Sequence, residues 1–317
     1  MTKLLLNADG KVLTSNYKVL KAPEVEDTLQ TLINDSKRMI ETFRNTSNEL
    51  VQKLFKTLDT SRVTDMEGAF ISSDIESIPK TLDCSSCKRT YDMFRLCGDL
   101  IIAEVPDISK SAACNSMFWT CTKLEEVIFE KLPVSTTAGS MFSDCRKLKK
   151  ITVKENETVQ WSGLSYTFSG CGVLEEIPII FDVRNITIKG NIDGIVSGCT
   201  ALKKLTLLNI KCDLTIGQGN GTISSDYGHL LTLESLINTI KELVNVGSTK
   251  TLKMGTANLE KIQDVYVRRT TEGDIPTCLS DNSNIDLAKA PCEICESTDE
   301  GAMLITAYAN SKNWTLA

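Results

Sequence analysis

Residues 117–127 read Met117-Phe118-Trp119-Thr120-Cys121-Thr122-Lys123-Leu124-Glu125-Glu126-Val127, and residues 141–151 read Met141-Phe142-Ser143-Asp144-Cys145-Arg146-Lys147-Leu148-Lys149-Lys150-Ile151. Both contain an aromatic residue, a cysteine, a leucine and an aliphatic residue at intervals of three. The other copies are Phe70-x-x-Ser73 (imperfect), Phe94-x-x-Cys97-x-x-Leu100, Phe168-x-x-Cys171-x-x-Leu174-x-x-Ile177 and Val196-x-x-Cys199-x-x-Leu202-x-x-Leu205. Successive copies start 24, 24, 24, 26 and 28 residues apart. A repeat of this length predicts a solenoid, because stacked units share a core that one unit cannot form alone.

Each unit is expected to combine a helical turn with a short strand. The aromatic residue and the cysteine lie three apart, which suits one turn of α- or 3₁₀-helix with both side chains on one face. The strand that follows should alternate, with Ile151 and Val153 pointing into the core and Thr152 pointing out. In the preceding copy, Val127 and Phe129 should point in. The sequence therefore predicts an α/β repeat solenoid with short parallel strands.

Charged pairs separate the leucine from the aliphatic residue in four copies. They are Glu125-Glu126, Lys149-Lys150, Glu175-Glu176 and Lys203-Lys204. Neighbouring strands lie about 4.8 Å apart, so these pairs are expected to stack as a ladder of alternating sign. A slip by one unit would place like charges opposite each other, which destabilises a sheet. We interpret the ladder as a device that sets the register rather than as a binding site.

The repeated phrase resembles the leucine-rich repeats of the BspA-like type, in which Ala or Met precedes the Phe-x-x-Cys-x-x-Leu core. The corresponding pairs here are Ala69-Phe70, Met93-Phe94, Met117-Phe118, Met141-Phe142 and Thr167-Phe168. Prolines near the family's post-strand proline are Pro79, Pro106, Pro133 and Pro178, although not in one register. The resemblance covers a little under half of the chain. Such repeats occur in bacterial surface proteins, secreted protozoan proteins and tailed-phage virion proteins, so the resemblance implies a binding or structural role.

Composition excludes several classes of function. The chain of 317 residues has a net charge of −6, a pI near 5.1 and no basic run, which argues against nucleic-acid binding. No apolar run approaches the roughly 18 residues of a membrane span, so we expect no membrane insertion. The first ten residues do not read as a signal peptide, because the apolar stretch Leu4–Leu6 is too short. We therefore expect a product made in a host cytoplasm without a secretory leader.

The chain has twelve cysteines, most of which are explained without chemistry. The repeat cysteines are expected to be reduced and to pack as small apolar groups. Cys84-x-x-Cys87 and Cys292-x-x-Cys295 together would suit a four-thiolate zinc site. These two pairs lie at opposite ends of the predicted solenoid, so we expect no metal and no cofactor. Neither pair opens a helix after a strand, which argues against a redox motif.

Catalysis has little support in the sequence. The single histidine, His229, directly precedes a predicted helix, where a structural role is the more common one. The glycine run Gly217-Gln218-Gly219-Asn220-Gly221 lacks the Lys-Ser/Thr of a phosphate loop. No carboxylate pair stands apart from the charge ladder. We therefore expect a protein that is not an enzyme, with no catalytic, cofactor-binding or metal-binding residue.

The chain divides into four expected segments. Residues 1–22 should form a strand pair for attachment, with Asp9-Gly10 as its turn, and residues 61–215 the solenoid. Residues 23–60 show 3,4-spaced apolar residues and read either as a coiled coil or as amphipathic helices that cap the first repeat. Residues 216–317 should form a C-terminal cap with a degenerate repeat.

The cap itself has a readable order of elements. We expect a helix over Leu233–Val244 that Thr232 caps, and then a degenerate strand and repeat at Leu252–Met254 and Leu259-x-x-Ile262. Residues 270–300 read as an excursion, and the tail from Ala302 reads as a helix and an end strand.

Two functional readings remain open. The opening residues 5–13 and the tail loosely resemble the ends of phage-encoded proteins, which favours a structural or adhesion protein of a tailed-phage virion (fibre, collar or tail-associated). Its expected partners are copies of itself, preferably as a trimer, other virion proteins, and a host-surface protein or glycan. The alternative is a bacterial leucine-rich-repeat surface or secreted module that binds a ligand.

Overall fold

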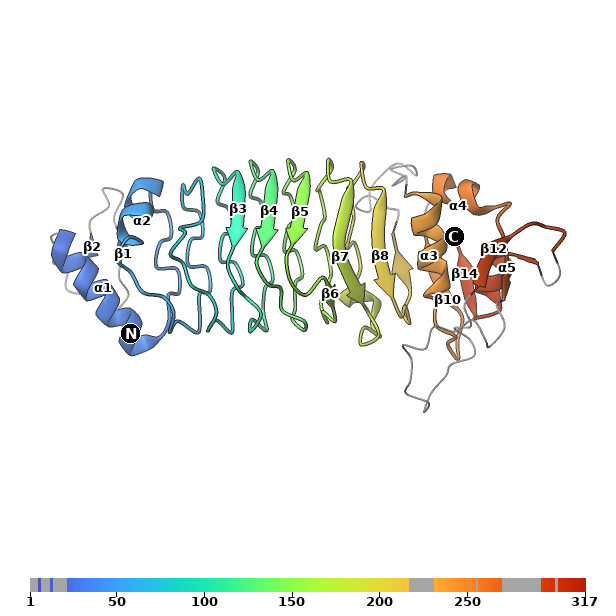
Figure 1. Ribbon diagram of the computed structural model, residues 1–317, viewed down its shortest axis with the longest axis horizontal. Coiled ribbons are helices and arrows are strands. Elements are labelled where there is room, and N and C mark those ends of the chain that lie inside the picture. The colour runs from blue at the N-terminus through green and yellow to red at the C-terminus, as the bar shows by residue number, and fades with distance from the viewer. Residues whose placement is uncertain are drawn as a thin grey trace.

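A computed structural model describes residues 5–6, 12–13, 22–216, 231–254, 256–269, 292–299 and 302–317. The molecule is elongated, and its repeat turns stack side by side along the long axis (Figure 1). Helices lie at both ends of this stack, with α1 and α2 at the N-terminal end and α3, α4 and α5 at the C-terminal end. The predicted solenoid is therefore confirmed over the repeat region.

Short parallel strands form one side of the solenoid, in two sheets. The first has the order β3 (Ile102–Val105), β4 (Glu126–Phe129), β5 (Lys150–Val153), and the second has the order β6 (Thr158–Val159), β7 (Glu176–Asp182), β8 (Lys204–Leu208). Val127 lies opposite Ile151 in the register, and both are buried. Thr152, the next residue along β5, is partly exposed, and Val153 after it is buried. The predicted alternation along the strands is thus correct.

The other side of the solenoid is a stack of turns, and the predicted helical turn between Phe and Cys is wrong. Two residues per repeat, four apart, adopt positive φ, which a right-handed helix cannot contain. The first column consists of Glu41, Gly68, Asp92, Ser116, Ser140, Tyr166 and Gly194, and the second of Asn45, Ser72, Leu96, Thr120, Asp144, Gly170 and Gly198. These residues turn alternate N–H groups toward the next repeat, so that Phe94 N–H donates to Met117 O (2.9 Å) while Cys97 N–H donates to Phe94 O (3.1 Å).

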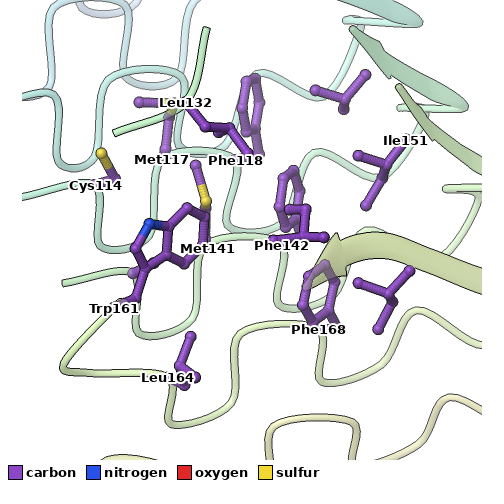
Figure 2. Packing of buried hydrophobic residues seen from close by; sticks show 14 of the residues in the cluster. Cys114, Met117, Phe118, Leu132, Met141, Phe142, Ile151, Trp161, Leu164 and Phe168 are labelled. Carbon is purple, nitrogen blue, oxygen red and sulfur yellow. The ribbon is translucent and has the colours of Figure 1, made fainter. Parts of the chain in front are cut away.

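A continuous column of phenylalanines lies between the turns and the strands. Consecutive rings stack with centroids 5.3 to 5.6 Å apart from Phe43 through Phe70, Phe94, Phe118 and Phe142 to Phe168. Figure 2 shows three of these rings, Phe118, Phe142 and Phe168, one above the other. Such offset stacks add about 0.5–1.5 kcal/mol per pair to the burial of the rings.

A column of thiols follows the rings. Each repeat cysteine donates through Sγ to the backbone carbonyl of the phenylalanine one repeat earlier, as Cys145 does to Phe118 O at 3.0 Å. The same contact recurs at Cys97, Cys121, Cys171 and Cys199. All five cysteines are buried, as the sequence predicted.

The thiol column predicts protection from alkylation. Labelling of the native protein near pH 8 should leave Cys121, Cys145 and Cys171 unmodified, because they are buried and burial raises the pKa of each thiol. Labelling in denaturant should modify all three, as read by peptide mass spectrometry. Rapid native modification of these three cysteines would contradict the observed packing.

The N-terminal end contains two helices rather than one. They are α1 (Ala22–Ser36) and α2 (Asn48–Leu54), and Ser47 caps α2 by accepting from Leu50 N–H. Residues 37–46 between the helices form an additional turn of the solenoid, in which Phe43 N–H donates to Ala69 O (2.7 Å). Met39 and Phe43, two of the 3,4-spaced apolar residues of segment 23–60, are fully buried within this chain. The coiled-coil alternative for residues 23–60 needs one continuous helix and is therefore wrong, because residues 37–46 instead pair with the first repeat.

Beyond the solenoid, the predicted helix at Leu233 is α3 (Leu233–Lys241), and Thr232 Oγ1 accepts from Ser235 N–H (3.2 Å). A parallel sheet follows with the order β14 (Trp314–Leu316), β10 (Lys250–Lys253), β9 (Leu214–Thr215). The expected degenerate repeat near Leu259 is instead helix α4 (Thr256–Ile262). The predicted end helix and strand of the tail are α5 (Ile305–Asn310) and β14.

The remaining elements are small. A second C-terminal sheet is antiparallel and consists of β12 (Cys292–Cys295), β11 (Tyr266–Arg269) and β13 (Met303–Leu304). A short 3₁₀ helix, η1, covers Lys189–Asn191. At the N-terminus β1 (Leu5–Leu6) pairs antiparallel with β2 (Val12–Leu13), and the expected turn at Asp9-Gly10 lies outside the described residues.

Candidate protein-binding surface

The charge ladder forms ion pairs between neighbouring repeats. Lys149 Nζ lies 2.9 Å from Glu125 Oε2, and Lys203 Nζ lies 2.8 Å from Glu175 Oε2. Lys150 similarly pairs with Glu126 at 2.6 Å. Hydrogen bonding to Lys149 and its charge lower the pKa of Glu125. These pairs confirm the predicted facing of opposite charges.

The ladder is divided into two halves rather than continuous over four repeats. Among the described residues no ion pair joins Lys149 or Lys150 to the next carboxylates, Glu175 and Glu176. The reason is that β5 closes the first sheet and β7 belongs to the second, at the point where the repeat grows from 24 to 26 residues. Other cross-repeat pairs are Asp99–Lys123, Glu130–Lys154 and Lys131–Glu155. Each spans 24 residues, which supports a role in setting the register.

Reversal of two ladder charges should destabilise the protein in a salt-dependent way. In the double variant Lys149→Glu and Lys150→Glu, the new carboxylates would face Glu125 and Glu126, where like charges repel. We expect the urea midpoint to fall at 20 mM salt and to recover partly at 500 mM salt, because exposed charges are screened. Lys211→Glu, an exposed lysine outside the ladder, is the control. A fall in the urea midpoint that does not depend on salt would contradict the role of these charges in stabilising the register.

The residues weighed for metal binding and catalysis do not assemble into a site in the described part of the chain. Cys84 and Cys87 are both buried, and Cys87 Sγ donates to Val63 O (3.3 Å). A hydrogen bond to Cys87 and then burial raise the pKa of Cys84 well above its ordinary value, so this thiol stays protonated. Nothing is described of the side chains of Cys292 and Cys295. His229 and the glycine run at 217–221 lie outside the described residues.

The turn face of the solenoid carries a group of large side chains that sequence reasoning missed. We call Arg95, Leu96 and Trp119 the turn-face patch. The Arg95 guanidinium lies over the Trp119 ring, 4.1 Å from the centroid, and Leu96 is 42% exposed. In later copies the position of Arg95 and Trp119 is occupied by serine, at Ser143, Ser169 and Ser197. An alignment of the repeat copies with one another therefore already shows Arg95 and Trp119 as large residues at a position that is otherwise serine in the later copies.

Leu96 occupies an unfavourable backbone conformation. Its φ is 62°, in the left-handed region, which costs a side-chain-bearing residue about 1–2 kcal/mol. The equivalent residues in later copies are Thr120, Asp144, Gly170 and Gly198. A large apolar residue here is therefore both strained and exposed to solvent. The fold requires the left-handed conformation at this position in every repeat, but it does not require a large apolar side chain there.

Replacement of Leu96 should test this strain. We expect Leu96→Asn to stabilise the protein by about 0.5–1 kcal/mol, because asparagine tolerates the left-handed region and the Leu96 side chain is exposed. Val173→Asn is the matched control, since Val173 is 43% exposed but has an ordinary φ, and it should show no gain. Chemical denaturation of both variants measures the difference. Destabilisation by Leu96→Asn would show that Leu96 supports the fold.

Neighbouring turns on this face are tied together by a nearly buried carboxylate. Asp65 is 6% exposed and accepts from Arg38 Nε (3.1 Å) and Arg89 Nη2 (2.5 Å), which belong to the preceding and the following turn. A hydrogen bond to Glu67 raises the pKa of Tyr91 to about 12. These contacts tie the repeat that carries Arg95 and Leu96 to the two turns before it.

Comparison with known proteins identifies the repeats. Residues 67–175 and 90–219 match the family described as BspA type Leucine rich repeat region, in six copies. No curated protein and no solved structure matches the chain significantly. In the described part of the chain, no helix is both long and apolar enough to cross a membrane. Residues 67–219 are therefore similar to BspA-type leucine-rich repeats, and a repeat scaffold of this kind suggests protein–protein binding.

Proposed function

We propose that the chain is a non-enzymatic structural and adhesion protein of a tailed-phage virion, in which the repeat scaffold binds other proteins through the turn-face patch. The observation that carries the binding role is Leu96, which is strained, exposed and next to the Arg95–Trp119 pair. Tryptophan and arginine are enriched among the residues that dominate binding energy at interfaces. The virion assignment rests on the likeness of the chain ends to phage-encoded proteins.

The same proposal includes a homo-oligomer, with a trimer favoured. Strands β1 and β2 form one antiparallel pair, and an isolated two-stranded pair is at best marginally stable in water. Contacts between copies through the N-terminal segment would supply the missing partner. Because Met39 and Phe43 are buried within the chain, these contacts involve the N-terminal strands rather than a coiled-coil seam. Light scattering on the full-length protein should give three times the chain mass, and a monomer at micromolar concentration would contradict this.

The virion assignment is tested by mass spectrometry of purified phage particles. We expect peptides of this chain in the particles after density-gradient purification, in a fixed ratio to the capsid protein. Their absence from particles, together with their presence on the surface of the bacterium or in the medium, would instead support a bacterial ligand-binding module.

The role of the turn-face patch is tested by variants in the assembled particle. The double variant Leu96→Asn and Trp119→Ser places residues suited to the fold at both positions. We expect at least a tenfold loss of incorporation or of host adsorption, whereas Val173→Asn should behave as the unmodified protein. Normal incorporation and normal adsorption of the double variant would remove the patch from the proposal.

A further inference from the structure

A groove of about 510 Å³ lies at the N-terminal end of the first sheet, between the end of α2 and β3. We call it the sheet-end groove. It is lined by Gln52, Phe55, Lys56, residues 77–81, Ile102 and Glu104. It lies apart from the turn-face patch, on the strand side of the solenoid.

The groove exists because the first repeat fails to add a strand. Ser77 makes a single parallel bridge to Ile102. The chain then turns away, with Leu82 N–H donating to Pro79 O at 3.0 Å. Among the described residues, Glu104 and Val105 consequently have a strand partner only on the β4 side. The outer edge of β3 therefore offers backbone groups that an additional extended segment can pair with.

The lining combines apolar surface with positive charge. Phe55 and Ile78 are buried beneath the groove, while Ile102 is 45% exposed. Lys56 and Lys80 are exposed and make no ion pair with any described residue. Lysines elsewhere on the strand side, such as Lys150 and Lys154, are paired with a carboxylate of the neighbouring repeat. Two lysines against the one carboxylate of Glu104 leave the groove with a local excess of positive charge.

We propose that the sheet-end groove binds an extended segment of a partner protein in which acidic and apolar residues alternate. The backbone of the segment pairs with the outer edge of β3. Its apolar side chains cover Ile102 and the surface above Phe55 and Ile78, and its carboxylates reach Lys56 and Lys80. Alternation suits this site because successive side chains of a strand point to opposite faces. The proposal concerns a second binding site and does not depend on the turn-face patch or on the virion.

Fluorescence polarisation with a labelled octapeptide tests the proposal on the full-length protein. The probe alternates Asp or Glu with Ile or Val, and the matched peptide carries Lys in place of every acid. We expect the acidic peptide to bind at least tenfold more tightly than the basic one, and to weaken with salt. Equal binding of the two peptides, or no binding of the acidic peptide up to 1 mM, would overturn the proposal.

Variants locate the binding on the protein. The double variant Lys56→Ala and Lys80→Ala should weaken the acidic peptide at least tenfold, and Ile102→Ser should weaken it about as much. The matched control is Lys149→Ala with Lys203→Ala, exposed lysines of the strand side that lie outside the groove, which should bind normally. An equal loss in the control would show binding by overall charge and would overturn the site. Self-association that Ile102→Ser abolishes would assign the groove to a second copy, and would also overturn the proposal.

Discussion

Phe118→Ala should lower the free energy of unfolding by about 3–5 kcal/mol, the range measured for removing buried aromatic rings. The ring is fully buried and stacks on both neighbours, with centroids 5.4 Å from Phe94 and 5.6 Å from Phe142. Its removal leaves a cavity that the stack cannot close, because each neighbouring ring is held by the next repeat. Both ring contacts are lost together, so the cost exceeds that of a ring at the end of the column.

Guanidinium denaturation measures this effect, and the variant Phe118→Leu is its control. Leucine retains most of the buried volume, so we expect a much smaller loss. The column itself offers a precedent, since Val196 stands at the phenylalanine position of the last repeat and is also buried. In a solenoid each repeat contacts only its neighbours, so Phe118→Ala should also broaden the transition as the two halves separate. A loss below about 1.5 kcal/mol would show that the repeats close around the cavity.

The stacking of the repeats could be predicted from the sequence, because the same residues recur at core positions. Phe, Cys and Leu at intervals of three predicted which side chains are buried, and alternation at Ile151–Val153 predicted the strand. The turns were not predictable from one copy, because a spacing of three suits both a helical turn and a β-turn. The difference lies in hydrogen bonds to the next repeat, such as Leu96 N–H to Trp119 O, which no single copy displays.

The first turn of the solenoid was missed although its signal was present. Met39-x-x-x-Phe43-x-x-Thr46 has the same spacing as Met66-x-x-x-Phe70-x-x-Ser73 in the first recognised copy. Its 3,4 spacing also fits an amphipathic helix, and the flanking helices α1 and α2 extended that pattern on both sides. Local periodicity alone therefore could not separate a helix from a turn of the solenoid.

The candidate binding surfaces depended on information that the sequence contains only in part. The replacement of serine by Arg95 and Trp119 is visible when the copies are aligned, but the φ of Leu96 is not. Likewise, Pro79 marks the end of a strand in the sequence, but the groove beside it requires the positions of α2 and β3. A repeat scaffold is specified by what its copies share, whereas its binding sites lie where the copies differ.

Because a buried cysteine recurs in successive repeats, we expect alkaline pH to destabilise the protein. This is the second large effect that we expect. Burial raises the pKa of Cys97 and of Cys199 from 9.0 to about 12, and it raises the pKa of Cys121, Cys145 and Cys171 as well. An unfolded chain ionises these thiols near pH 9, whereas the folded chain keeps them protonated. Stability is therefore full below pH 9 and is lost as the pH rises toward the folded values, by up to about 1.4 kcal/mol per thiol and pH unit.

Urea unfolding at a series of pH values between 8 and 10.5 measures this loss. Lysines and tyrosines also titrate in this range, so the decisive comparison is with the double variant Cys121→Ala and Cys145→Ala. We expect this variant to be less stable at pH 7, because two small cavities form. Its free energy of unfolding should nevertheless fall less steeply above pH 9. The two slopes should differ by up to nearly 3 kcal/mol per pH unit, because two thiols have been removed. Parallel curves for the two proteins would show that the thiols ionise without unfolding, and would contradict their burial in a shared core.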